Sequence, residues 1–177
     1  MNFFANTILA LLLCGSATAG AFELSSKDIA EGQHMSNTFE FSGWGCKGSN
    51  LSPQLAWSNA PAGTKSFAIT VYDPDAPTGS GFWHWIAIEL PASVSELPRG
   101  ADVAKLGARQ FTNDYGANEF GGACPPVGDG MHRYQFTVWA LPVEKMEIPD
   151  GVSPAVVGFN LNAVALDKKT LTATYNR

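Results

Sequence analysis

A dense polar and aromatic stretch, Tyr72–Trp85, joins two short apolar runs of the sequence. The run before it, Phe67–Val71, and the run after it, Ile86–Leu90, each have the length and composition typical of a buried strand. We therefore expect the two runs to lie in a sheet, with the stretch as their connection. Asp73 and His84 then both lie where a strand meets this loop, so the two side chains can share one end of the sheet.

The other segments favour a β-rich domain with little helix. His132–Leu141 alternates between two sets of side chains and predicts a strand. Ser153–Asp167 predicts a helix, with Ser153 as N-cap and Pro154 in the first turn. Eighteen glycines and eleven prolines indicate many turns, and 177 residues suit one domain. Further predicted elements are strands at Phe22–Ser26, Thr38–Phe41 and Thr170–Tyr175 and a helical turn within Pro91–Leu97.

The N-terminus has the pattern of a secretory signal peptide. A short apolar run, Ile8–Leu13, is followed by small residues that allow cleavage after Ala19 or Ala21. The run is too short to span a bilayer, which takes roughly 20 apolar residues. The first seven residues contain no Lys or Arg, so a buried N-terminal helix is the alternative. We predict a signal peptide at residues 1–21, a single domain at residues 22–177, and a periplasmic or secreted protein that does not span a membrane.

Export determines how the cysteines are interpreted. Cys14 lies in the predicted signal peptide, so the mature chain keeps Cys46 and Cys124. Two thiols in an oxidising compartment suggest one disulfide, with two separate buried thiols as the alternative. A bond would close a loop of roughly eighty residues, a constraint that stabilises by about 4 kcal/mol in the chain-entropy model. Two cysteines alone do not form a zinc site, and we predict neither a metal nor a cofactor.

Several function classes are disfavoured by the sequence. The net charge is −5 and no basic run is longer than Lys168-Lys169, so we expect no nucleic-acid partner. Gly43–Gly48 matches the dinucleotide fingerprint G-x-G-x-x-G, but Pro53 follows closely and prevents the long helix that this motif requires. We interpret it as a glycine-rich loop. Neither G-x-S-x-G nor H-E-x-x-H occurs, which makes a hydrolase the least favoured alternative.

A group of polar residues indicates a site for an anion. Asp73 and His84 flank the first loop, while His132 and Tyr134 begin a later strand. An Asp beside a His holds one ring nitrogen and favours the imidazolium ion, whose other N–H can bind an anion. Tyr134 adds a hydroxyl donor, and glycine N–H groups of a neighbouring loop can add more. Structural hydrogen bonding is the alternative role for these histidines, and we expect Asp75 to cap its own turn.

Three motifs resemble the phosphatidylethanolamine-binding protein family, also called the Raf kinase inhibitor protein family, in its bacterial branch. D-P-D-A-P at residues 73–77, C-P-P-V-G at 124–128 and G-M-H-R-Y at 130–134 occur in order. The similarity extends from about Phe39 to Tyr175. It implies a mainly β fold, with a large central antiparallel sheet packed on a smaller sheet and peripheral helices. By position, it implies an anion pocket formed by Asp73, Pro77, His84, Gly122, Pro125, His132 and Tyr134.

The resemblance also implies a function. It favours a non-enzymatic protein that binds a phosphate-bearing small molecule or a phospholipid head group, with a part in signalling. The alternative is an inhibitor of a protease, a kinase or a host signalling protein that acts through the loops around the pocket. The connection between Pro77 and His84 is shorter and less charged than in eukaryotic members, which argues against direct kinase inhibition. A protein partner and either a monomer or a homodimer are compatible with the sequence.

Overall fold

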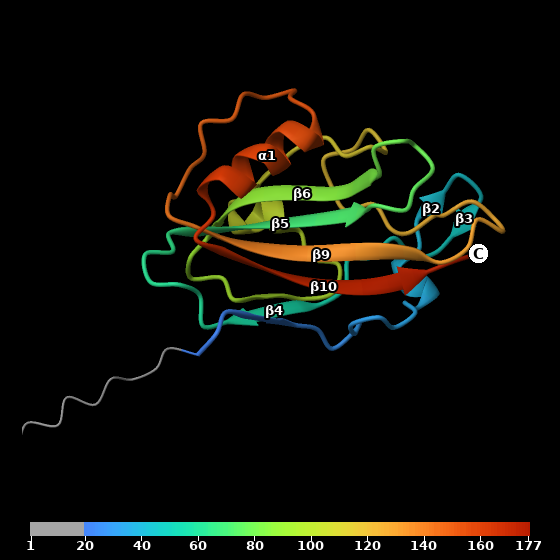
Figure 1. Ribbon diagram of the computed structural model, residues 1–177, viewed down its shortest axis with the longest axis horizontal. Helices are drawn as coiled ribbons and strands as arrows, with labels where there is room; N and C mark the ends of the chain where they lie inside the picture. Colours follow the sequence, from blue (N-terminus) through green and yellow to red (C-terminus); the bar gives the residue numbers. More distant parts are fainter. Residues whose placement is uncertain (1–19) are drawn as a thin grey trace, which may run out of the picture.

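A five-stranded antiparallel sheet forms the centre of the computed structural model, in the order β10-β9-β5-β6-β8 (Figure 1). The structure describes residues 20–177, so nearly all of the predicted signal peptide lies outside it. The predicted strands on either side of the polar stretch are confirmed as β5 and β6. The five strands are β5 (Ser66–Asp73), β6 (Phe82–Pro91), β8 (Arg109–Gln110), β9 (His132–Leu141) and β10 (Asp167–Tyr175).

A smaller antiparallel sheet, in the order β1-β4-β7, packs on one face of the central sheet, as the resemblance implies. The helix α1 covers the opposite face. The remaining elements are β1 (Glu23–Ser25), β4 (Leu55–Ser58), β7 (Glu96–Leu97), the hairpin strands β2 (Ser42–Gly43) and β3 (Cys46–Lys47), the 3-10 turns η1 (Asn37–Phe39) and η2 (Val103–Leu106), and α1 (Pro154–Val164).

Strand β9 shows why a strand of this composition has to lie inside the domain. Tyr134, Phe136 and Val138 belong to the core between the two sheets, whereas Trp139 and Leu141 belong to the core beneath α1. Successive side chains of a strand point to opposite faces, so an apolar strand of this kind needs a cover on both faces. The small sheet and α1 provide these two covers, and they leave the ends of the central strands free to form a site.

The predicted helix is confirmed as α1, but it ends earlier than expected. It stops at Val164, because Ala165 is already extended and Asp167 begins β10. Ser153 precedes the helix in an extended conformation, yet its side chain makes no capping hydrogen bond. The interior Gly158 has a packing reason, since a Cβ there would lie 2.8 Å from the indole of Trp83.

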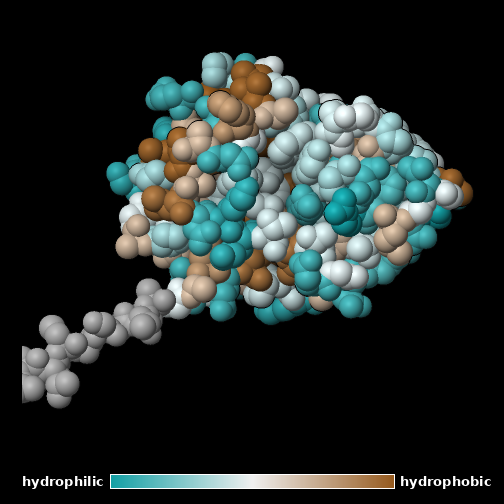
Figure 2. Space-filling model, in the orientation of Figure 1, coloured by the Kyte–Doolittle hydropathy of each residue, from teal (hydrophilic) through white to brown (hydrophobic). Residues whose placement is uncertain are grey.

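Large apolar side chains are exposed on the outward side of α1. Val156 is 42% exposed and Phe159 74% exposed, and Figure 2 shows apolar groups over this part of the molecule. Only Val157, Gly158 and Leu161 of the helix are buried. Within residues 20–177 no helix combines the length and apolar character needed to cross a membrane.

Two short segments differ from the sequence-based expectation. Thr38–Phe41 was predicted as a strand, but the chain turns there into η1, because the Ser36 hydroxyl accepts a hydrogen bond from the Thr38 N–H. Such a local side-chain bond offers the backbone an alternative to a sheet ladder. Pro91–Leu97 was predicted to hold a helical turn. It holds instead a non-helical turn, closed by a hydrogen bond from the Val94 N–H to Pro91 O. Its last two residues form β7, which pairs with β4.

Candidate functional site

A cavity of about 190 Å³ lies where the C-terminal end of β5 meets the N-terminal ends of β6 and β9. The antiparallel pairing of these strands brings Asp73, His84 and His132 to the same end of the sheet. All the site residues predicted from the sequence line this cavity except Gly122. Its walls are formed by Trp44, Asp73, Ala76, Pro77, Thr78, Phe82, His84, Tyr115, Cys124, Pro125, Pro126, His132 and Tyr134.

A buried ion pair joins β5 to β9 at the cavity. His132 Nδ1 donates to Asp73 Oδ2 over 2.7 Å, and His132 Nε2 donates to Asp129 Oδ2 over 3.2 Å. Ionised carboxylates only accept, so both ring nitrogens carry hydrogen and the imidazolium ion is favoured. Burial alone would lower the pKa of His132, but the hydrogen bonds and charges of Asp73 and Asp129 outweigh it and raise that pKa. Asp73 therefore pairs with the histidine of the later motif rather than with His84.

The D-P-D-A-P turn is fixed by two carboxylates with different roles. Asp73 Oδ1 accepts the Asp75 N–H at 2.8 Å and so caps the turn itself. The sequence-based expectation that Asp75 caps its own turn is wrong, because the Asp75 carboxylate binds Arg133 of β9 instead. It accepts from Arg133 Nε at 2.8 Å, Nη2 at 2.7 Å and the backbone N–H at 2.9 Å. These hydrogen bonds lower the pKa of Asp75, and they fasten the loop to the sheet.

His84 is held in one orientation by backbone carbonyl groups. Its Nδ1 lies 2.9 Å from Gly121 O and 3.2 Å from Gly122 O. A carbonyl oxygen can only accept, so Nδ1 carries the hydrogen. Burial lowers the pKa of His84 despite the opposing effects of these carbonyls and of Asp73. The neutral ring therefore has an unprotonated Nε2 on its other edge.

Two buried polar atoms at the cavity have no hydrogen-bond partner within residues 20–177. They are His84 Nε2 and the hydroxyl of Tyr134, and the two rings pack edge to face with centroids 5.1 Å apart. Burial and the charge of Asp73 raise the pKa of Tyr134, so its hydroxyl keeps its hydrogen. Unsatisfied buried polar groups are rare in folded proteins and call for an explanation, such as a bound ligand. The other such side-chain atom in this range, Trp57 Nε1, belongs to the core between the sheets.

The loop after Phe120 was expected to offer a backbone N–H to the ligand, from Gly122 or a neighbour. The Gly122 N–H donates to Asn50 Oδ1 at 2.7 Å, and those of Gly121 and Ala123 donate to backbone carbonyls. Gly122 therefore offers its carbonyl to His84 and has no free N–H for a ligand. Two residues further on, Cys124 lines the cavity, and its N–H makes no hydrogen bond within residues 20–177.

The predicted disulfide joins this wall to the β2–β3 hairpin. Cys46 and Cys124 are bonded, with their Cα atoms 6.0 Å apart. The glycine-rich Gly43–Gly48 segment is this hairpin and precedes no helix, so the interpretation as a loop is confirmed. At its tip Trp44 takes a left-handed conformation with φ of 53° and lines the cavity.

An aromatic wall of the cavity was missed by the sequence-based reasoning. Tyr115 stacks on Phe41 with ring centroids 4.0 Å apart, and it also packs against Trp44, Phe82 and His84. The Tyr115 hydroxyl donates to Gly122 O at 2.9 Å, which helps to fix the carbonyl that holds His84. Phe41, Trp44 and Tyr115 come from loops and Phe82 from the start of β6, and no local pattern in the sequence relates them.

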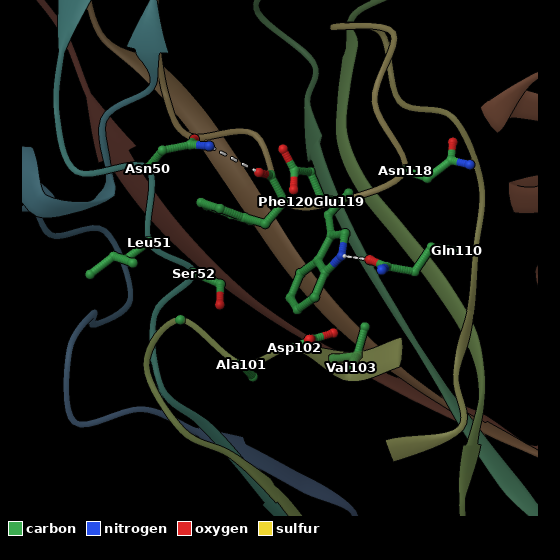
Figure 3. Close-up of a pocket in the computed structure, with 12 residues that line it drawn as sticks. Asn50, Leu51, Ser52, Ala101, Asp102, Val103, Gln110, Asn118, Glu119 and Phe120 are labelled. Carbon is green, nitrogen blue, oxygen red and sulfur yellow. Dashed lines mark hydrogen bonds between the residues drawn. The ribbon is translucent and has the colours of Figure 1, made fainter. Parts of the chain in front are cut away.

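Another cavity, of about 370 Å³, is lined in part by residues 118–120, which directly precede the two glycines whose carbonyls hold His84 (Figure 3). Asn50 links the two regions, since its Nδ2 donates to Phe120 O at 3.3 Å while its Oδ1 binds the Gly122 N–H. Gln110 accepts from Trp85 Nε1 at 2.7 Å. No predicted site residue lines this cavity, and neither does any residue with an unpartnered buried side-chain atom within residues 20–177. We therefore place the candidate site in the smaller cavity.

Fold and site together define an antiparallel β-domain with a small pocket at one end of its central sheet, in which a few buried polar groups lie within a mainly apolar wall. The family model for phosphatidylethanolamine-binding protein matches residues 25–176, and the chain belongs to this family. The chain is 50% identical over 175 residues to UPF0098 protein YbcL of Escherichia coli K12, covering 96% of this chain and 95% of that protein. It is 44% identical over 158 residues to UPF0098 protein YbhB of the same strain, covering 87% and 99% of the two chains.

Solved structures agree with this assignment. The crystal structure of E. coli YbcL, described as a new member of the mammalian PEBP family, matches with a TM-score of 0.84 and 50% identity over 88% of this chain and 98% of that one. A PEBP homologue from Chlamydia trachomatis, CT736, matches with a TM-score of 0.75 and 29% identity over 89% and 98% of the two chains. The fold implied by the sequence resemblance is thus confirmed.

Proposed function

We propose that the protein is a non-enzymatic binding protein whose cavity takes a phosphate-bearing group such as a phospholipid head group. The observation that carries the proposal is the pair of buried atoms without partners, His84 Nε2 and Tyr134 OH, at one cavity. A buried polar group without a partner costs about 1–3 kcal/mol. A ligand that forms hydrogen bonds with both atoms removes this cost in the complex. The name of the family supports the choice of ligand class.

Charges of both signs surround the cavity. Asp73 and Asp129 lie beside the His132 imidazolium, and Arg177 Nε donates to Pro125 O at 2.8 Å. The anionic groups would repel a bare phosphate in part, whereas a zwitterionic head group offers each sign a counterpart. The cavity volume of about 190 Å³ also suits a small head group, because drug-sized ligands occupy roughly 300–1,000 Å³. The rest of a lipid would remain outside.

Calorimetric titration tests this proposal. Wild-type protein titrated with phosphoethanolamine and with inorganic phosphate should give saturable heats, and the double variant His84→Ala, His132→Ala should give none. The matched control is His34→Ala, since His34 is exposed, binds Asn176 and does not line the cavity. It should titrate like the wild type. Equal heats for wild type and the double variant would refute the proposal.

Exposed apolar residues around the cavity favour a second candidate function, inhibition of a protein partner through the loops. Trp44 is 67% exposed, Val127 78% and Met131 53%. Trp44 lines the cavity, and the other two adjoin Pro126 and His132 of its wall. Native mass spectrometry of the protein purified from its host, wild type beside Val127→Ser with Met131→Ser, tests this role. The role requires a stoichiometric partner that the variant loses, and a partner retained by both counts against it.

Export remains part of the proposal. The bond between Cys46 and Cys124 supports an oxidising compartment, where structural disulfides form and persist. Mass spectrometry of the mature protein tests this point, since cleavage after Ala19 or Ala21 gives two defined masses. A mature protein that retains its initial residues would contradict it.

A further inference from the structure

The hydrogen-bond partners of His84 determine what its free nitrogen can do. Two carbonyl oxygens face Nδ1, and neither can donate a hydrogen. The other neutral tautomer would place an unprotonated Nδ1 against these carbonyls, and turning the ring over would put Cδ2 there and leave the carbonyls without their donor. The neutral ring thus presents a lone pair at Nε2, and Nε2 has no partner within residues 20–177. An unprotonated nitrogen in this position accepts a hydrogen bond, and it repels a ligand oxygen that carries no hydrogen atom.

We propose that His84 makes the pocket selective for ligands that bring a hydrogen atom to its Nε2, so that a singly protonated phosphomonoester binds in preference to a phosphodiester that has no N–H or O–H donor elsewhere. This inference rests on the proposed function and specifies its ligand class. Both phosphate species carry one negative charge, but only the monoester has a P–OH group. One of its oxygens can accept from the Tyr134 hydroxyl while the P–OH donates to His84 Nε2. A diester without another donor group has no hydrogen to donate and leaves two lone pairs facing each other.

If His84 itself is protonated, its Nε2 can donate to a ligand oxygen that carries no hydrogen. The groups around the ring determine how readily His84 takes up this proton. The charged and titratable groups that act on the ring or contact it are Asp73 of β5, Asp114 and Tyr115 of the loop after β8, and Tyr134 of β9. His132 of β9 lines the same cavity, and Arg177 at the C-terminus acts on the neighbouring Tyr134. Asp73 and Asp114 favour the imidazolium ion, but burial outweighs them and lowers the pKa of His84. When a diester binds, His84 therefore has to take up a proton from solvent, and the free-energy cost of this protonation grows with pH.

The expected selectivity follows from the missing hydrogen bond. Hydrogen bonds to charged groups contribute enough that losing one weakens binding by about tenfold or more. A phosphomonoester loses its last proton near a pKa of about 6. Its affinity should therefore also fall, by up to about tenfold per pH unit, once the pH is well above that value. The diester should bind weakly throughout and weaken further as the pH rises.

NMR titration with ethyl phosphate and dimethyl phosphate tests the proposal, since these isomers share their atoms and differ in the P–OH group. At about pH 6, where the singly protonated monoester is abundant, ethyl phosphate should bind at least about tenfold more tightly. The variant His84→Gln carries an amide that can donate, so it should narrow this ratio. Tyr134→Phe should weaken both probes alike. Vesicles containing phosphatidic acid, compared with soluble ethyl phosphate, distinguish a lipid-borne monoester from a free one.

The outcomes separate the two proposals. Equal affinities for the two isomers, or a preference for the diester, would overturn the selectivity while leaving the proposed function intact. No saturable binding of any phosphate probe would overturn both. If His84→Gln does not fold, the ring nitrogens of wild-type His84 still decide the matter in a ¹⁵N spectrum of the free protein. Hydrogen on Nδ1 alone is expected, and hydrogen on Nε2 would contradict the inference.

Discussion

Replacement of Tyr134 by phenylalanine removes a hydroxyl that is buried without a partner, in a side chain that is 1% exposed. Burying such a group costs about 1–3 kcal/mol, so its loss should leave the free energy of unfolding unchanged or raise it by about 1 kcal/mol. Affinity for phosphoethanolamine should move in the opposite direction. A hydrogen bond to a charged ligand contributes about 1.5–3 kcal/mol, so Tyr134→Phe should weaken binding about tenfold or more. Urea denaturation and calorimetric titration measure the two effects.

Tyr175→Phe is the matched control on the neighbouring strand β10. The Tyr175 hydroxyl donates to Glu40 Oε2 at 3.0 Å, and Tyr175 does not line the cavity. Its removal breaks a formed hydrogen bond, so it should lower the free energy of unfolding by about 1 kcal/mol and leave ligand affinity unchanged. The reasoning would be refuted if Tyr134→Phe destabilised the protein as Tyr175→Phe does, with no loss of affinity.

Three further predictions concern stability. Asp73→Asn should lower the free energy of unfolding by about 3 kcal/mol at about pH 6 in urea denaturation, because it breaks the buried pair with His132. The pair's contribution is present below the ordinary pKa of His132 and is lost as pH rises through its raised folded-state pKa, so the difference from wild type should shrink in alkali; a difference that grows would contradict the pairing. Cys46→Ser should cost about 4 kcal/mol in urea, since the bond closes a separation of 78 residues, and an unchanged midpoint would contradict this. Gly158→Ala should lower the melting temperature despite a helix-propensity gain of about 1 kcal/mol, because its Cβ would lie 2.8 Å from Trp83; a higher melting temperature would contradict this account of the packing.

The long strands could be predicted from local patterns, from alternation in His132–Leu141 and from apolar runs in Phe67–Val71 and Ile86–Leu90, whereas the short segment Thr38–Phe41 could not. The positions of Asp73, His84 and His132 at strand ends also followed from local patterns. Their partners did not, since the pairing of Asp73 with His132 depends on β5 lying beside β9. Family resemblance supplied the overall arrangement, but not which atoms of each residue are free.

The loop between β8 and β9 illustrates the part that the sequence could not predict. Gly122 or a neighbour was expected to offer a backbone N–H, but the N–H of Gly122 itself donates to Asn50, more than seventy residues away in sequence. Asn50 reaches it from a left-handed conformation with φ of 54°. The aromatic wall around Tyr115 similarly gathers residues from separate loops. Contacts of this kind depend on how the loops pack in three dimensions, and no periodic pattern encodes them.

Amide NMR during titration with phosphoethanolamine tests the central claim, that the smaller cavity is a site for phosphate-bearing groups. Cys124 lines this cavity and its N–H makes no hydrogen bond within residues 20–177, whereas Asn118 lines the larger cavity. Saturable shifts should appear at Cys124 and at its neighbours in the wall, with Asn118 unchanged. Shifts confined to the larger cavity, or no saturable shift at Cys124, would contradict the account.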